Sequence, residues 1–263
     1  MSLIQIDAGK CKKDGLCAEV CPSALIFRQG KELPQVAADM EKFCNACGHC
    51  VGICPSGALS LERMPIGDCA AVRRELEPDT DAIEQFLKRR RSIREFKQDP
   101  VPRETLERVI DAARWAPSAV NVQPVRWTAV TKREDVLFLA GQTAEWMRET
   151  NNAPIYLAAW DRGRDMILRG APHLVVACSP ADSVWGPIDC SIALTYLELA
   201  AQANDLGTCW AGLLVRAAGA RPEIGRFLGL EEGLKIQGAV MIGRPKYKYR
   251  RIPVRNAAKI TWL

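Results

Sequence analysis

A run of four cysteines that ends in proline is the feature that most constrains how this chain can fold. Cys44, Cys47, Cys50 and Cys54 are separated by two, two and three residues, and Pro55 follows directly. Thiolates are soft ligands that suit iron in a cluster, and three of them at this spacing let one tight loop reach three corners of a cubane. The fourth cysteine of such a run ligates a second cluster. The run therefore predicts a module that holds two iron–sulfur clusters.

A similar run lies 33 residues earlier and differs at one ligand position. Its cysteines are Cys11, Cys17 and Cys21, and Asp14 stands where a further cysteine is expected. An Ala-Leu pair follows each run, with one residue inserted in the second copy, and the repeat predicts two structurally equivalent halves. A carboxylate is a harder ligand than a thiolate. The iron at Asp14 is therefore expected to be labile, and a three-iron form of this cluster stays open.

The last cysteine of each run ligates the other cluster, and this crossed rule assigns the ligands of both clusters. Cluster one takes Cys11, Asp14, Cys17 and Cys54, and cluster two takes Cys21, Cys44, Cys47 and Cys50. Three alternatives stay open: zinc in place of iron, Asp14 as a solvated turn residue beside a three-iron cluster, and His49 as a residue that packs on a cluster without binding it. About the first 65 residues resemble bacterial two-cluster ferredoxins, including variants with Asp at this place.

The distribution of cysteines and the net charge limit the expected cellular location of the chain and the partners it can bind. Seven of the 11 cysteines lie before residue 55, and such clustering in a cytosolic protein favours metal over disulfides. The other four are expected to be inert buried thiols: Cys69, Cys178, Cys190 and Cys209. No stretch is typical of a membrane span or a signal peptide, so we expect a cytoplasmic protein. The net charge of +5 lies entirely after residue 66, which suits an anionic ligand but is too small to indicate nucleic acid.

The rest of the chain alternates helical and strand patterns. Helices are predicted near residues 80–91, with Thr80 as cap, around Leu106 and Val109, at 134–150 and at 188–204, with Gly207 as the cap that ends the last one. Strands are predicted at 125–131, 173–179, 208–215 and 234–243. Residues 160–172 suit a mobile cover. The fold class is α+β, with a ferredoxin-type module at 1–66, a linker at 67–80 and an α/β sandwich at 81–263.

Several motifs of this second part resemble the nitroreductase family. They are the basic segment at 89–96, the Pro-Ser-Ala-Val-Asn-Val-Gln-Pro loop at 117–124, Asp-Leu-Gly-Thr-Cys-Trp-Ala-Gly at 205–212, Gly-Arg-Pro at 243–245 and the tail at 249–255. The resemblance implies a mixed sheet flanked by helices, bound FMN, and a homodimer with the flavin at the subunit interface. An arginine-rich segment also suits the FMN phosphate on chemical grounds, since arginine pairs bidentately with phosphate.

The resemblance also implies which residues hold FMN. The Arg-x-Ser-x-Arg segment would bind the phosphate, the ribityl chain and the pyrimidine edge through Arg90, Arg91, Ser92 and Arg94. The following loop, often from the partner subunit, would lie against the ring through Pro117, Ser118, Ala119, Asn121 and Gln123. The turn of Trp210, Ala211 and Gly212 would pass behind the ring and offer a backbone N–H near N5. Arg251, with Arg255 as the alternate, would close on the phosphate.

Two redox modules in one chain predict an oxidoreductase in which the flavin N5, and no side chain, carries the chemistry. The leading hypothesis is that an external donor, a ferredoxin-type protein or NAD(P)H, reduces the clusters and that the clusters pass the electrons to FMN. Reduced FMN then reduces a small molecule such as a nitroaromatic, a quinone or an activated alkene. A second hypothesis reverses the flow, so that NAD(P)H reduces FMN and the clusters are the acceptors. A third makes the chain an electron-transfer or redox-sensing protein without its own small substrate. Trp160 and Trp185 are either core residues or the wall of a substrate channel.

Overall fold

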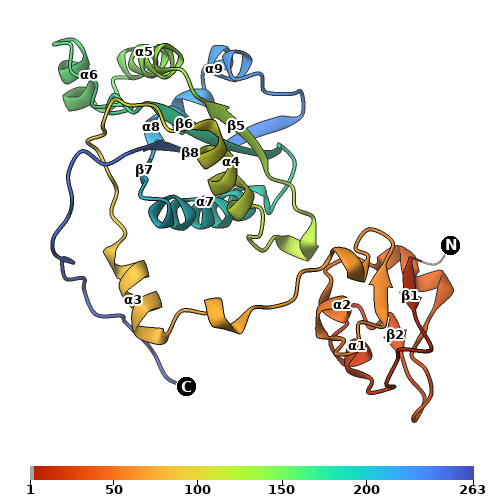
Figure 1. Cartoon of the computed structure of the whole chain (residues 1–263). Helices are drawn as coiled ribbons and strands as arrows, with labels where there is room; N and C mark the ends of the chain where they lie inside the picture. The colour runs from red at the N-terminus through yellow and green to blue at the C-terminus, as the bar shows by residue number, and fades with distance from the viewer. Residues whose placement is uncertain (1–2) are drawn as a thin grey trace. The chain divides into compact units, whose positions relative to one another are not determined.

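The computed structural model describes residues 3–263 and divides the chain into two compact units (Figure 1). The first is Met1–Glu77 together with Val120–Val122, and the second is Pro78–Ala119 with Gln123–Leu263. The chain passes from one unit to the other between Glu77 and Pro78, which lie within residues 67–80. Among residues 3–263, no helix has the length and apolar character that crossing a bilayer requires.

Short strands and single helical turns make up the first unit. Strand β1 (Ile4–Ile6) pairs antiparallel with β4 (Leu59–Leu61), and β2 (Ile26–Phe27) pairs antiparallel with β3 (Gln35–Val36). Helices α1 (Leu16–Glu19) and α2 (His49–Ile53) carry a cysteine each into a small core, and 3-10 turns occupy Ala38–Phe43, Ile66–Asp68 and Arg74–Leu76. Apolar residues of the two sheets and of α2 surround these thiols: Ile4, Ile26, Val51, Leu59 and Leu61.

The internal repeat is visible in the backbone of the first unit. Gly15 and Gly48, 33 residues apart, precede α1 and α2 with φ of 85° and 76°. Lys13 and Ala46 also adopt the left-handed conformation, with φ of 57° and 50°. Side chains with a Cβ pay a steric cost there. The chain therefore makes the same tight turn twice, as the sequence repeat predicts.

The predicted one-residue insertion after the second run is wrong. The Leu25 N–H lies 3.4 Å from Cys21 Sγ, and the Ala58 N–H lies 3.3 Å from Cys54 Sγ. Leu25 therefore corresponds to Ala58, again 33 residues later, and the Ala-Leu pairs match by coincidence of residue type. The two halves keep one register through the strands that follow.

A four-stranded antiparallel sheet in the order β5-β6-β8-β7 forms the centre of the second unit. Its strands are β5 (Arg126–Val130), β6 (His173–Pro180), β7 (Gly207–Trp210) and β8 (Leu234–Gly243). Its helices are α3 (Thr80–Arg89), α4 (Arg103–Ala113), α5 (Arg133–Glu149), α6 (Pro154–Trp160), α7 (Gly186–Ala203), α8 (Gly212–Ala218) and α9 (Pro222–Phe227).

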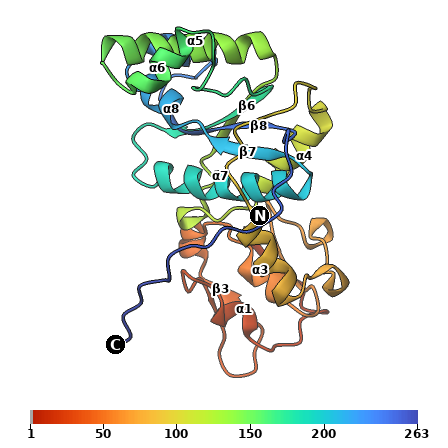
Figure 2. The same ribbon diagram turned by 90° about the vertical axis from the view of Figure 1, so that its left-hand side faces the viewer.

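Helices cover both faces of this sheet (Figures 1 and 2). Alternate residues of β6 point to opposite faces: Leu174 and Val176 pack in one apolar core with α5 and α8, whereas Val175 and Ala177 pack in the other with α4 and α7. The result is a three-layer sandwich in which β6 and β8 are buried on both faces. This arrangement agrees with the α/β sandwich predicted for residues 81–263.

Two predicted helix caps are wrong. Asp79, and not Thr80, caps α3, because its Oδ1 accepts the Ala82 N–H at 2.7 Å. Helix α7 ends before Asn204, and Asp205 takes the left-handed conformation with φ of 55°. Gly207 opens β7 instead. It has to be small because a Cβ there would collide with Ile93, whose own Cβ would be 2.8 Å away.

Two further predictions in the second unit need correction. Residues 208–215 are not one strand, since β7 stops at Trp210 and α8 begins at Gly212. Residues 160–172 are not a loose cover. Ile167 and Leu168 lie in the core, and the Asp165 carboxylate accepts the N–H groups of Ile167, Leu168 and Gly170 at 2.8–2.9 Å. Buried apolar side chains and three hydrogen bonds hold this segment in place.

Candidate redox site

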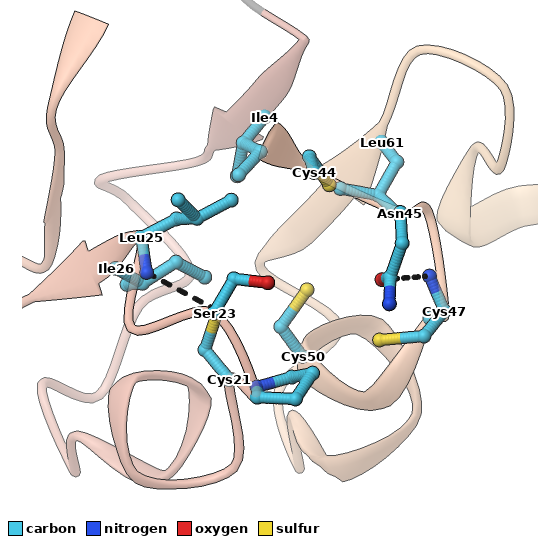
Figure 3. A pocket seen from close by; sticks show the side chains of 12 residues that line it. Ile4, Cys21, Ser23, Leu25, Ile26, Cys44, Asn45, Cys47, Cys50 and Leu61 are labelled. Atoms are coloured by element: carbon cyan, nitrogen blue, oxygen red, sulfur yellow. Dashed lines mark hydrogen bonds between the residues drawn. The ribbon is translucent and has the colours of Figure 1, made fainter. Parts of the chain in front are cut away.

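Four thiols of the first unit line one small cavity, which Figure 3 shows. They are Cys21, Cys44, Cys47 and Cys50, the set that the crossed rule assigns to cluster two. Apolar side chains complete the wall: Ile4, Leu25, Ile26 and Leu61. Soft thiolates in a water-poor pocket are the donor set that iron–sulfur clusters require, so the residues present fit a cluster.

The other predicted ligands come together around Cys17. Burial raises the pKa of this thiol, and the negative charges that raise it further belong to Cys11, Cys54 and Asp14. Around Cys50, burial and the charges of Cys47, Cys21 and Cys44 raise the pKa to about 11. The fold thus sorts the eight predicted ligands into two groups, each with one member from the other run. A bound metal would hold such thiols deprotonated.

Backbone N–H groups approach the sulfurs, as expected for a cluster cradle. Lys13 N–H donates to Cys11 Sγ at 3.4 Å, in addition to the amides that approach Cys21 and Cys54. Burial raises the pKa of Cys54, but hydrogen bonds, first that from Ala58, outweigh it and lower the pKa overall. Asp14 is exposed, and its Oδ1 accepts the Leu16 N–H at 3.1 Å.

Zinc receives no support from the positions of the described side chains. Within residues 3–263, no group of three or more His, Cys, Asp or Glu side chains surrounds a point that a single ion could occupy. A cubane spreads its ligands over several irons, so this geometry is compatible with a cluster. His49 is exposed at the first position of α2.

In the second unit, the Arg-x-Ser-x-Arg segment docks on the edge strand of the sheet. The Ile93 N–H donates to the Thr208 carbonyl at 2.8 Å, and Ser92 forms a parallel bridge with Thr208. Further along, Lys97 N–H donates to the Arg244 carbonyl at 2.8 Å. The segment is therefore held as an additional strand-like edge beside β7.

A cavity of about 590 Å³ opens beside this segment. Its size falls in the range of ligand pockets. Cationic side chains of two chain segments, residues 89–97 and 244–248, line it, and the fold brings them together: Arg89, Arg90, Arg91, Lys97, Arg244 and Lys248. Tyr247 and Tyr249 add aromatic surface. The donor set fits an anionic, aromatic nucleotide such as FMN, although Trp210, Ala211 and Gly212 are not among the lining residues.

Glu198 is a site residue that the sequence interpretation missed. Its Oε1 accepts the Thr208 hydroxyl at 2.8 Å and lies 3.5 Å from Arg90 Nη1. The side chains of Arg90 and Glu198 are only 26% and 15% exposed. The one available signal was an acidic residue within an otherwise apolar helical stretch, and nothing local linked it to Arg90, 108 residues away.

Arg94 affects the pKa of Cys209 in β7. Burial raises the pKa of Cys209, while the cations of Arg94, Arg169 and Arg90 act in the opposite direction. Arg94 itself is exposed, and its Nη1 is 3.4 Å from the Ser92 carbonyl. The Glu198 carboxylate acts against these cations, and the net effect of the surroundings is a raised pKa.

In the turn predicted to lie behind the flavin ring, some backbone N–H groups are already used in hydrogen bonds. Ala211 is buried, and its N–H donates to the Ala239 carbonyl of β8 at 2.8 Å. Gly212 is the first residue of α8, where the helix itself does not use the N–H. Trp210 is 41% exposed beside it. Of this turn, Gly212 is the residue suited to donate to a ligand.

The predicted ring-contacting loop lies at a different place. Pro117, Ser118 and Gln123 line a cavity of about 210 Å³, apart from the one that holds Arg90. Buried Asp189 accepts the Ala119 N–H at 3.0 Å, and Ser118 Oγ accepts the Gln123 N–H at 2.9 Å. One chain therefore does not bring the two halves of the predicted flavin site into one cavity.

Between these residues, Val120–Val122 belong to the first unit. The Asn121 side-chain amide donates to the carbonyls of Asn45 and Ala46 at 3.1 and 3.0 Å. Its predicted role toward the flavin ring is therefore not reflected in these contacts. Arg251 and Arg255 lie in the exposed C-terminal segment beyond the last strand.

The remaining cysteines and tryptophans divide by burial. Cys178, Cys190 and Cys209 are buried, and burial raises the pKa of Cys178 to about 11 and of Cys190 to about 12. Cys69 is only partly buried. Trp160 packs against the core near α5, whereas Trp185 is 56% exposed.

Known proteins match both units. The profile of the Nitroreductase family covers residues 87–244, and that of the 4Fe-4S dicluster domain covers residues 3–60. An NADH dehydrogenase of Thermus thermophilus is 29% identical over 206 residues, which is 67% of this chain and 94% of that protein. A Methanothermobacter thermautotrophicus protein with the provisional name NADH dehydrogenase/NAD(P)H nitroreductase is 30% identical over 133 residues. That match takes in 49% of this chain but only 60% of the relative.

Solved structures agree in fold. Nitroreductases with bound FMN from Bacteroides fragilis and Desulfitobacterium hafniense superpose with TM-scores of 0.61 and 0.62. Both are 23% identical, cover 70% and 71% of this chain, and are matched over their whole length. The chain belongs to the nitroreductase family of oxidoreductases and carries a 4Fe-4S dicluster domain of ferredoxin type ahead of the family fold.

Proposed function

We propose that this protein is an FMN-dependent oxidoreductase that passes electrons between two iron–sulfur clusters and FMN to reduce a small molecule such as a nitroaromatic, a quinone or an activated alkene. One observation carries the proposal: a single chain holds a four-thiol cavity and a cavity of about 590 Å³ lined by arginines. The FMN bound in the Bacteroides fragilis and Desulfitobacterium hafniense structures supports the second cofactor.

The protein's own residues bind and orient the cofactors in this proposal. FMN, when bound, supplies hydride transfer from its N5. Arg90 and Arg91 face the cavity and would hold the phosphate, with Ser92 and Arg94 beside them. Gly212 would donate its N–H toward the ring, and the thiols of the first unit would hold the clusters. No side chain is assigned as an acid or base.

A homodimer would complete the flavin site. Pro117, Ser118 and Gln123 do not share a cavity with Arg90, so a second copy is proposed to supply that loop. Helix α3 supports this, because it buries no residue although Ile83 and Leu87 are apolar, 40% and 51% exposed. The C-terminal segment that carries Arg251 and Arg255 is likewise exposed and offers a second contact arm.

The direction of electron flow has two candidates. A ferredoxin-type donor would deliver electrons through the clusters to FMN. The name of the Thermus thermophilus relative, NADH dehydrogenase, favours the opposite direction, in which NAD(P)H reduces FMN and the clusters receive the electrons. Anaerobic mixing separates the two: bleaching of the flavin by NAD(P)H supports the second, and bleaching only by reduced ferredoxin supports the first. If neither donor bleached the flavin, the proposed function would be contradicted.

The test of the proposal is the content of iron, acid-labile sulfide and flavin in protein purified without oxygen. About eight irons and one FMN per chain would support two four-iron clusters, with Asp14 or an external ligand completing cluster one. About seven irons and one FMN would support a three-iron cluster one. Iron without flavin would contradict the proposal for the second unit.

A further inference from the structure

Arg28 covers the turn that presents the first ligand run. It follows β2, and its guanidinium lies flat against Gly15, so that a Cβ on Gly15 would be 2.6 Å from Nε and 2.8 Å from Cζ. Arg28 Nη1 also donates to the Lys13 carbonyl at 2.9 Å. Lys13 in turn donates its N–H to Cys11 Sγ, and the next residue is Asp14. One cation therefore contacts both sides of Asp14.

The other half of the repeat has a neutral group at the same place. A Cβ on Gly48 would be 2.7 Å from Met64 Sδ and 3.0 Å from its Cε. The carbonyl that corresponds to that of Lys13 belongs to Ala46, and it accepts from the neutral amide of Asn121. The two turns have the same backbone, but only the first is covered by a charge.

This difference bears on the reduction of the clusters, because each takes up one electron and becomes more negative. A positive charge held close to a cluster stabilises the reduced form. Arg28 is only partly exposed, so water screens its charge less than that of a free surface cation. Hydrogen bonds and charges around the sulfurs are known means of setting cluster potentials.

We propose that Arg28 is a tuning and positioning residue of cluster one: it raises the reduction potential of that cluster above the value its ligands alone would set, and it holds the Lys13–Asp14 peptide. The proposal rests on the two-cluster function proposed above. Met64 leaves cluster two without this effect. The asymmetry between the two halves thus comes from the covering side chain as well as from the Asp14 ligand.

The test is a redox titration of the anaerobic holoprotein, followed by EPR so that each cluster is observed separately. Arg28→Met, which copies the other half, is expected to lower the potential of cluster one. Its reduction equilibrium should shift at least threefold toward the oxidised form. This is about 28 mV for a one-electron couple, since tenfold corresponds to 59 mV. Cluster two is expected to stay unchanged. Arg28→Lys, which keeps the charge without the flat contact, should give a smaller shift.

Two further variants keep the test decisive. Lys31→Met removes an exposed cation from the same β2–β3 turn, and it is expected to shift neither cluster. Met64→Arg places a cation over Gly48 and is expected to raise the potential of cluster two, so the idea can be tested even if Arg28→Met does not fold.

An equal shift from Lys31→Met would mean that only net charge matters and would overturn the inference. So would an unchanged cluster one potential in Arg28→Met, or an unchanged cluster two potential in Met64→Arg. Absence of a cluster one signal and of its iron in the wild-type protein would instead contradict the proposed function itself.

Discussion

The two units of this protein are held together by different means. The first has strands of two or three residues and one small apolar core around its thiols. The second has an eight-residue and a ten-residue strand at the centre of its sheet, with an apolar core on each face. Small domains with little core usually need metals or cross-links to fold. From this comparison we expect that the proposed clusters stabilise the first unit and that side-chain packing stabilises the second.

Loss of one cluster-two ligand should give the largest effect. Cys47→Ala is expected to remove about four irons and to expose the backbone amides of the first unit to hydrogen exchange, because cluster binding and folding are coupled. The flavin content should be unchanged. Iron analysis and exchange mass spectrometry measure both. Cys69→Ala is the matched control, a partly buried thiol of the same unit outside the ligand runs. If flavin were lost together with the iron, the two units would not be stabilised by separate means.

The arginine-lined cavity gives the corresponding test in the second unit. Arg90→Ala is expected to weaken FMN binding by about 1.5–3 kcal/mol, the range for hydrogen bonds to charged groups, and to leave the iron content unchanged. Glu198→Gln should act in the opposite direction, since it removes a negative charge beside Arg90. Fluorescence titration of apoprotein with FMN measures both. Arg103→Ala is the control, an arginine that is 84% exposed and paired with Glu107. Equal losses in Arg90→Ala and Arg103→Ala would contradict the assignment of this cavity.

The same contrast explains what the sequence could predict. The ligands of the first unit follow a local spacing rule, so Cys44 through Cys54 indicate a cluster loop by themselves. Strand β6 was predicted because a short apolar run indicates a buried strand. Helix caps failed where a single hydrogen bond decides, as at Asp79.

Residues that act over long separations were not predictable. The Arg90–Glu198 pair spans 108 residues and the Asp189–Ala119 hydrogen bond spans 70. Gly207 was interpreted as a cap because glycine often ends helices, whereas its true constraint is the packing of Ile93. Such contacts depend on how elements are brought together, and no pattern along the chain records them.

A glycine variant tests whether packing holds the flavin unit. Gly207→Ala would force the docked segment away from β7, because the new methyl group would overlap Ile93. We expect a loss of about 1–3 kcal/mol, typical of overpacking in a core. All seven tryptophans follow residue 80, so tryptophan fluorescence during denaturation reports on the second unit alone. Gly219→Ala is the control, since its Cβ would meet only the Arg216 carbonyl at an ordinary 3.5 Å. Equal stability of the two variants would show that the segment at 91–94 is loosely held.

The smallest expected effect is on the pH dependence of stability, for which each unit contains one histidine. His173 is 2% exposed, its Nε2 accepts the Val101 N–H at 2.8 Å, and its Nδ1 faces the Thr131 carbonyl at 3.0 Å. Nε2 must therefore be unprotonated in the folded state. Burial lowers the pKa of His173 below its ordinary value of 6.5, although the Thr131 carbonyl acts against this.

Below pH 6.5 the unfolded chain therefore binds more protons at His173 than the folded chain does, so the stability of the second unit falls with acidity until the folded pKa is reached. The loss should be on the order of 1 kcal/mol, the size of one buried hydrogen bond, and should develop as the pH falls below about 6.5. Denaturation followed by tryptophan fluorescence measures it. His173→Gln should flatten this slope, because an amide oxygen can accept from Val101 without titrating. His49→Gln, at an exposed position of the first unit, should leave it as it is. An unchanged slope in His173→Gln would mean that the acid sensitivity of the packed unit lies elsewhere than in this buried ring.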